Sequence, residues 1–187
     1  MTPSRSAPIF DSAHAAVTFA MRYSARGMSP TTPMTQLLPG KRLGRGTGLH
    51  GYAGAAQAGM VLRLIGTLPI DQAAVLRLRF GYNEVECREC GTMSPDAAWL
   101  AAAQHVAGWP ELAGVPPQAL RAAVATAAGL QRLPSTSSNA EAQMSDRTLR
   151  ERVKATRDRI AALELAAMAA IDARLTESGT VGEVASA

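Results

Sequence analysis

The sequence predicts an all-α fold, in which a compact helical domain precedes a C-terminal helix-turn-helix-like unit that runs into a long helix. Hydrophobic residues make up 47% of the chain and aromatic residues only 4%, because much of the hydrophobic content is alanine, the strongest helix former. Alternating runs of β-branched residues, which are typical of strands, are almost absent. Helices packed closely on one another are therefore expected.

The N-terminal part of the chain contains one expected helix between two irregular segments. Residues 1–9 are expected to form a flexible tail. A helix is expected over residues 10–26, where Asp11 or Ser12 is a candidate cap and apolar residues recur at helical spacing. Residues 27–51 are rich in glycine and proline, so we expect a long loop there.

The central part of the chain reads as two helices and a cysteine-bearing turn. Apolar periodicity predicts helices over residues 52–68 and 69–80, and Gly81 ends the second. The two cysteines lie in the following turn, residues 82–93. These elements complete the first half of an expected helical domain that spans residues 10–134.

Two further helices are expected before the C-terminal unit. In residues 94–109, Ser94 is the expected cap, Pro95 the first helical residue and Asp96 part of the first turn. The next helix starts at a Pro-Pro pair and is closed by Pro134.

The last expected helix runs from about Asp146 to Thr176, with Ser145 as its cap. Its apolar positions alternate in steps of four and three, which predicts a seam against the body of the protein or a partner helix. A homodimer through residues 149–175 is one form of that contact. The seam residues are Leu149, Val153, Thr156, Ile160, Leu163, Ala167 and Ala170. The C-terminal unit is expected over residues 135–176, and residues 177–187 are expected to fray.

Positive charge is concentrated in two segments, although the formal net charge is only +4. Clustered cations favour a polyanionic partner such as double-stranded DNA, and the alternative is a solvated helix face. The first cluster lies in the glycine-rich loop and comprises Lys41, Arg42 and Arg45. The second lies in the last helix and comprises Arg147, Arg150, Arg152, Lys154, Arg157 and Arg159.

The start of the last helix has the composition of a DNA-recognition helix. In helix-turn-helix proteins, the N-terminal residues of that helix meet base edges in the major groove. Arg147 or Arg150 is long enough to bond guanine O6 and N7 bidentately. The other candidate DNA-contacting residues here are Ser145, Thr148, Lys154 and Arg157. The alternative function is a helical interaction protein that binds a host protein and no DNA.

Cys87 and Cys90 form a C-x-x-C turn, which is the knuckle of many zinc sites. His105, on the following helix, is the nearest candidate for a third ligand. Zinc usually has four ligands and the chain contains no second cysteine pair, so ordinary thiols are the alternative.

Catalysis and membrane insertion are not expected from this sequence. Acidic residues are dispersed, and no histidine pairs with a serine or cysteine nucleophile, so a non-enzymatic protein is predicted. No segment reaches the ~18 consecutive apolar residues of a membrane span, and the N-terminus lacks the apolar core of a signal peptide. The cytoplasm of a bacterial host cell is the expected location.

Two segments resemble region 4 of bacterial primary sigma factors. In the first, a Leu-Pro turn leads into a helix, with matches at Leu68, Pro69, Val75, Leu76, Leu78, Arg79, Phe80 and Gly81. In the second, Met144 takes the hydrophobic turn position, Ser145 the cap, and Thr148 and Leu149 a pair seen in many helix-turn-helix proteins. The chain departs from the pattern in two ways. About sixty residues separate the halves, and Gln143 stands where glycine is usual.

The whole pattern resembles small DNA-binding regulators of phages and prophages that are related to late-gene antitermination proteins. The resemblance covers roughly residues 10 to 175. It implies control of transcription through promoter DNA or RNA polymerase. Relatives often carry more cysteines in the central insert than the two present here.

Overall fold

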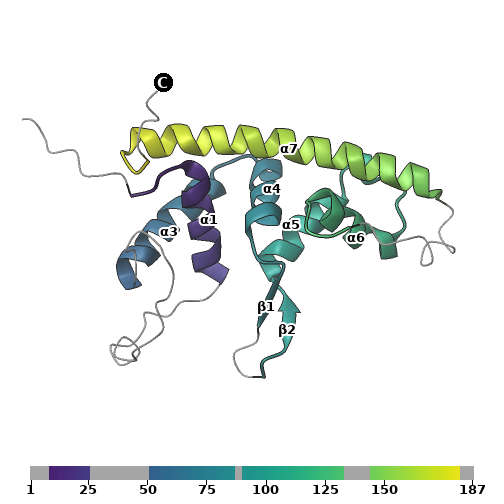
Figure 1. The fold of residues 1–187 in the computed structure, drawn as a ribbon, viewed down its shortest axis with the longest axis horizontal. Coiled ribbons are helices and arrows are strands. Elements are labelled where there is room, and N and C mark those ends of the chain that lie inside the picture. The colour runs from purple at the N-terminus through teal and green to yellow at the C-terminus, as the bar shows by residue number, and fades with distance from the viewer. Residues whose placement is uncertain (1–8, 26–50, 87–89, 133–143, 182–187) are drawn as a thin grey trace, which may run out of the picture. The chain divides into compact units, whose positions relative to one another are not determined.

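The computed structural model describes residues 9–25, 51–86, 90–132 and 144–181. In these residues helices dominate, and the sheet consists of two strands of three residues each, which confirms the expected all-α class (Figure 1). In the part of the chain described, no helix is long and apolar enough to cross a membrane.

The chain divides into two units, which are described separately. Unit 1 comprises residues 1–67 and 168–187, and unit 2 comprises residues 68–167. Helix α7 (Asp146–Glu177) contributes residues to both. These limits differ from the expected helical domain over residues 10–134, because unit 1 combines segments from both ends of the sequence.

Unit 1 is built on helices α1 (Ala13–Ala25) and α3 (Gly51–Gly66), which pack against each other. The hydroxyl of Ser12 accepts the backbone N–H of Ala15 at 3.2 Å, so Ser12 is the α1 cap of the two that the sequence offered. The core of the unit is formed by small and medium-sized apolar side chains, among them Val17, Ala20, Val61, Ile65, Ile171 and Leu175.

The C-terminal part of unit 1 is ordered against the N-terminal part. The carbonyl of Thr180 accepts the backbone N–H groups of Ile9 at 3.0 Å and Phe10 at 3.1 Å. Phe10 and Val181 form a parallel bridge, and each is only 3% exposed. The expectation that the chain frays from residue 177 is therefore wrong for Thr180 and Val181, because they bury surface against a segment far away in the sequence.

In its described residues, unit 2 contains four helical elements besides the first part of α7. They are α4 (Ile70–Phe80), α5 (Ala97–Ala107), a 3₁₀ turn η1 (Pro110–Leu112) and α6 (Pro117–Ala127). Helix α5 packs on both α4 and α6. The buried cluster includes Leu78, Trp99, Val106, Val124 and Ile160.

A β-hairpin precedes α5, over the predicted cysteine-bearing turn and the first two residues, Ser94 and Pro95, of the predicted helix. Strands β1 (Glu84–Glu86) and β2 (Met93–Pro95) pair antiparallel, with Val85 opposite Ser94. Ser94 and Pro95 are therefore strand residues and not the helix start. The cap of α5 is Asp96, whose carboxylate accepts the backbone N–H of Trp99 at 2.8 Å.

Candidate nucleic-acid interface

Helix α7 begins with the cap that the sequence predicts. The hydroxyl of Ser145 accepts the backbone N–H of Thr148 at 3.2 Å, and its carbonyl accepts that of Leu149 at 3.0 Å. The Ser145 and Thr148 hydroxyls also lie 2.8 Å apart. Asp146 occupies the first turn, where a negative charge interacts favourably with the helix dipole.

One side of the first half of α7 is buried in unit 2. Leu149, Val153, Thr156 and Ile160 are each no more than 4% exposed. The hydroxyl of Thr156 donates to the carbonyl of Arg152 at 2.9 Å, which satisfies this buried polar group. The expected seam therefore packs against the body of this chain at these positions, which was one of the two alternatives.

Two arginines of the basic cluster lie beside the buried side and are structural. Arg159 donates to both carboxylate oxygens of Glu111 at 3.1 Å and to Asp71 at 3.0 Å. Its guanidinium also lies 4.1 Å from the centre of the Trp109 ring. Arg152 donates to the backbone carbonyls of Glu111 and Ala113.

Asp71 is the centre of this ion-pair network. His105 Nε2 donates to Asp71 Oδ1 at 2.6 Å, and Trp109 Nε1 donates to the same oxygen at 3.3 Å. The hydrogen bond from His105, assisted by those from Arg159 and Trp109, holds the pKa of the Asp71 carboxyl below its usual value despite partial burial. His105, Trp109 and Arg159, the three partners of Asp71, all belong to unit 2.

The other cations of α7 are exposed on a different side of the helix. Arg147, Arg150, Lys154 and Arg157 follow one another at steps of three, four and three, so they share one face. The Arg147 side chain is 89% exposed and pairs with Glu151 at 3.0 Å. Arg150 and Lys154 form no ion pair with any residue in the described part of the chain.

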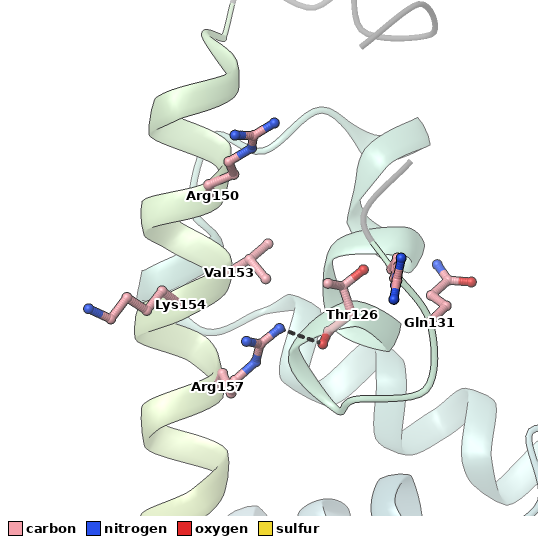
Figure 2. Close-up of a pocket in the computed structure, with 7 residues that line it drawn as sticks. Thr126, Gln131, Arg150, Val153, Lys154 and Arg157 are labelled. Atoms are coloured by element: carbon pink, nitrogen blue, oxygen red, sulfur yellow. Dashed lines mark hydrogen bonds between the residues drawn. The ribbon is translucent and has the colours of Figure 1, made fainter. Parts of the chain in front are cut away.

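A pocket lies between this face and the C-terminal end of α6 (Figure 2). Its volume is about 310 Å³. Thr126, Gln131 and Arg132 line it from the α6 side, and Arg150, Val153, Lys154 and Arg157 from α7. Figure 2 shows Arg150 and Arg157 extending towards the α6 side, whereas the ammonium end of Lys154 extends away from it.

The end of α6 is shaped by a glycine. Gly129 has a φ of 76°, in the left-handed region, and its N–H and that of Leu130 bond back to the carbonyls of Thr126 and Ala125. The helix therefore ends at Ala127, well before Pro134, because the N–H groups of the turn bond to the last carbonyls of the helix. Arg157 Nη2 also donates to the Thr126 carbonyl at 3.3 Å, which links α7 to this turn.

The sequence did not single out Thr126, Gln131 or Arg132. Gly129 was the available signal, because a glycine near the end of a helical pattern predicts that the chain turns there. The signal does not say towards which helix the chain turns. Only the tertiary structure places Arg132 and the α7 arginines around the same pocket.

Of the other predicted site residues, some lie outside the described residues and the others make contacts elsewhere. Lys41, Arg42 and Arg45 lie outside the described residues, as do Gln143 and residues 135–142 of the expected C-terminal unit. Cys87 is also outside them. Cys90 Sγ lies 2.9 Å from Thr92 Oγ1, and His105 is bonded to Asp71. In the residues that the structure describes, no three His, Cys, Asp or Glu side chains are placed to hold a metal ion.

The residues of the sigma-like resemblance divide between core and surface. Val75, Leu76 and Leu78 are buried in α4, and Gly81 follows its last residue. Comparison of the chain with protein-family models, curated proteins and solved structures finds no match. A functional assignment therefore depends on the exposed face of α7 and the adjoining pocket.

Proposed function

We propose that this protein is a non-enzymatic DNA-binding regulator of transcription, and that the exposed face of α7 contacts duplex DNA. The observation that carries the proposal is a row of four exposed cations, Arg147, Arg150, Lys154 and Arg157, on a helix whose other side is buried. Burial of that side anchors the helix, so the cations are presented by a rigid element.

The chemistry of these side chains suits a DNA groove. Arginine forms two parallel hydrogen bonds to guanine O6 and N7, and lysine neutralises phosphate as a point charge. Arg147 and Arg150 are nearest the helix start, where base contacts are made in helix-turn-helix proteins. Ser145 and Thr148 are engaged in the cap, so their expected contribution is to hold the helix start beside the DNA backbone.

The test is binding of a labelled duplex, followed by fluorescence anisotropy over a series of salt concentrations. Each phosphate contact contributes about 0.9 to the slope of log affinity against log salt. The double variant Arg150→Ala/Lys154→Ala should therefore bind more weakly and flatten the slope by up to about two units. Arg174→Ala is the matched control, because Arg174 is exposed in the last turn of the same helix.

Two outcomes of this experiment argue against the proposal. If wild-type protein shows no salt-dependent binding to duplex DNA, the alternative of a protein that binds another protein and no DNA gains support. If Arg174→Ala reduces the slope as much as the double variant does, binding reflects general positive charge and not this face.

Further parts of the proposed function depend on the phage-regulator resemblance or on sequence pattern. RNA polymerase is the second expected partner, and Lys41, Arg42 and Arg45 are expected to add phosphate contacts. A homodimer through residues 149–175 would have to use positions outside the buried seam, such as Leu165, which is 74% exposed. Sedimentation velocity of the wild type and of Leu165→Glu tests that contact.

A further inference from the structure

The pocket beside α7 is strongly positive. Three guanidinium groups come from its lining residues, none of which is acidic, whereas the ammonium end of Lys154, another lining residue, extends away from the α6 side. Arg157 bonds to the Thr126 carbonyl, whereas Arg132 and Arg150 form no ion pair within the described part of the chain. Cations gathered around one concavity raise the local concentration of anions, so the pocket favours an anionic ligand.

The lining also indicates which anion fits. The planar fork of arginine matches the geometry of a phosphate group, and Gln131 adds an amide donor. Val153 and the aliphatic stems of the arginines add apolar surface. A volume of about 310 Å³ lies at the lower end of the range for small-molecule pockets, roughly 300–1,000 Å³, so there is room for an organic part beside the phosphate.

We infer that this pocket binds a small organic phosphate, with Arg132 and Arg150 holding the phosphate group. Arg132 belongs only to the pocket, and Arg147 only to the exposed face, whereas Arg150, Lys154 and Arg157 belong to both. A ligand that occupies Arg150 removes this residue from DNA. The ligand therefore acts as an effector that releases DNA. This effector role rests on the proposed function, whereas binding of the ligand to the pocket does not.

Binding of the ligand is tested without DNA, by isothermal titration calorimetry of the full chain with adenosine monophosphate. Adenosine and inorganic phosphate are titrated in parallel. We expect the monophosphate to bind more tightly than either. Arg132→Ala and Arg150→Ala should each weaken it by about ten- to a hundredfold, because each removes a charge-assisted hydrogen bond. Arg147→Ala is the matched control and should leave its affinity unchanged.

Several results would overturn the ligand assignment. If adenosine bound as tightly as adenosine monophosphate, the pocket would not recognise the phosphate group. If inorganic phosphate bound as tightly as adenosine monophosphate, the pocket would not recognise the organic part of the ligand. If Arg147→Ala and Arg132→Ala lowered the affinity for adenosine monophosphate equally, binding would be due to general surface charge and not to the pocket. Circular dichroism melting of each variant distinguishes these results from unfolding, and Arg132→Lys, which keeps the charge but not the fork, should bind with intermediate affinity.

The effector role is tested by adding adenosine monophosphate to the protein–duplex complex and following anisotropy. Release of the duplex by the monophosphate, but not by the same concentration of adenosine, is expected. Arg132→Ala should still bind DNA and resist release. If the monophosphate binds and the duplex never does, the proposed function fails and the pocket assignment stands. If the duplex binds and the monophosphate does not, the pocket assignment fails and the proposed function stands.

Discussion

Arg159 is a structural residue, although it belongs to the same basic cluster as the proposed DNA contacts. It is paired with Asp71 and Glu111, and its side chain is 32% exposed. Arg159→Ala would leave two carboxylates without their main cation and should lower the free energy of unfolding by about 1–3 kcal/mol. Urea denaturation followed by circular dichroism measures this loss.

The control for Arg159 is Arg147, whose ion pair with Glu151 is exposed to solvent. Exposed pairs of this kind add little to stability, so Arg147→Ala should melt like the wild type. Equal destabilisation by the two substitutions would contradict the division of the cluster into structural and exposed arginines.

Asp71 makes stability depend on pH in the acid range. Its pKa is lowered in the folded protein from an ordinary value of 3.8. The contribution of the Asp71 carboxylate to the free energy of unfolding is therefore fully present above pH 3.8. The contribution is lost as the pH falls through the lower folded pKa, because protonation ends the charged interactions with His105 and Arg159. Asp71→Asn should therefore be less stable than wild type at pH 7, by about 1–2 kcal/mol.

The difference between wild type and Asp71→Asn should shrink as the pH falls below about 4. Urea unfolding at a series of pH values from 7 to 2.5 measures both curves. A difference that stays constant over this range would mean that the Asp71 charge does not contribute to the stability of unit 2.

At the scale of elements, α7 must be held by its apolar side if it is to present its cations. Ile160 is 2% exposed in the unit 2 core, and Leu165, on the same helix, is 74% exposed. Ile160→Ala should cost roughly 2–5 kcal/mol of unfolding free energy, because it removes buried methyl groups and leaves a cavity. Leu165→Ala should cost less than about 0.5 kcal/mol.

The start of α7 depends on one hydroxyl. Ser145→Ala removes the acceptor for the Thr148 N–H and should lower stability by about 1 kcal/mol. Ser145→Asp replaces the acceptor and should restore most of the loss. Hydrogen exchange of the first-turn amides localises the effect, and unchanged protection in Ser145→Ala would show that the cap contributes little.

At the scale of the whole molecule, unit 1 requires both ends of the sequence. Truncation after Ser178 removes the Thr180 carbonyl, which accepts the backbone N–H groups of Ile9 and Phe10, and it removes Val181, which forms the β-bridge with Phe10. We expect faster hydrogen exchange over α1, measured by mass spectrometry, because the buried Phe10 loses its neighbour. Truncation after Val181 is the control and should leave exchange over α1 unchanged. Equal protection in both truncated chains would contradict this role of the C-terminal residues.

The positions of the helices were largely predictable from the sequence. The limits of α4 and the cap of α7 follow from signals within a few residues, such as Gly81 and Ser145. Local rules were insufficient at the β-hairpin, because strands of three residues such as Glu84–Glu86 are too short to show alternation. They also failed at Ser94, which was predicted as the helix cap, because Ser94 pairs with Val85 in the sheet and Asp96, predicted only as a first-turn residue, is the cap.

The sequence by itself determined the helical class, the buried seam of α7 and the presence of a basic cluster, because all three depend on composition and spacing along one helix. Only the tertiary structure decided which cations are available. Arg159 meets Asp71 and Glu111 from other elements, whereas Arg150 meets none of the acids in the described part of the chain. The pocket likewise depends on the direction that the chain takes after Gly129, because this direction brings Arg132 beside α7. The sequence of neither segment specifies that contact by itself.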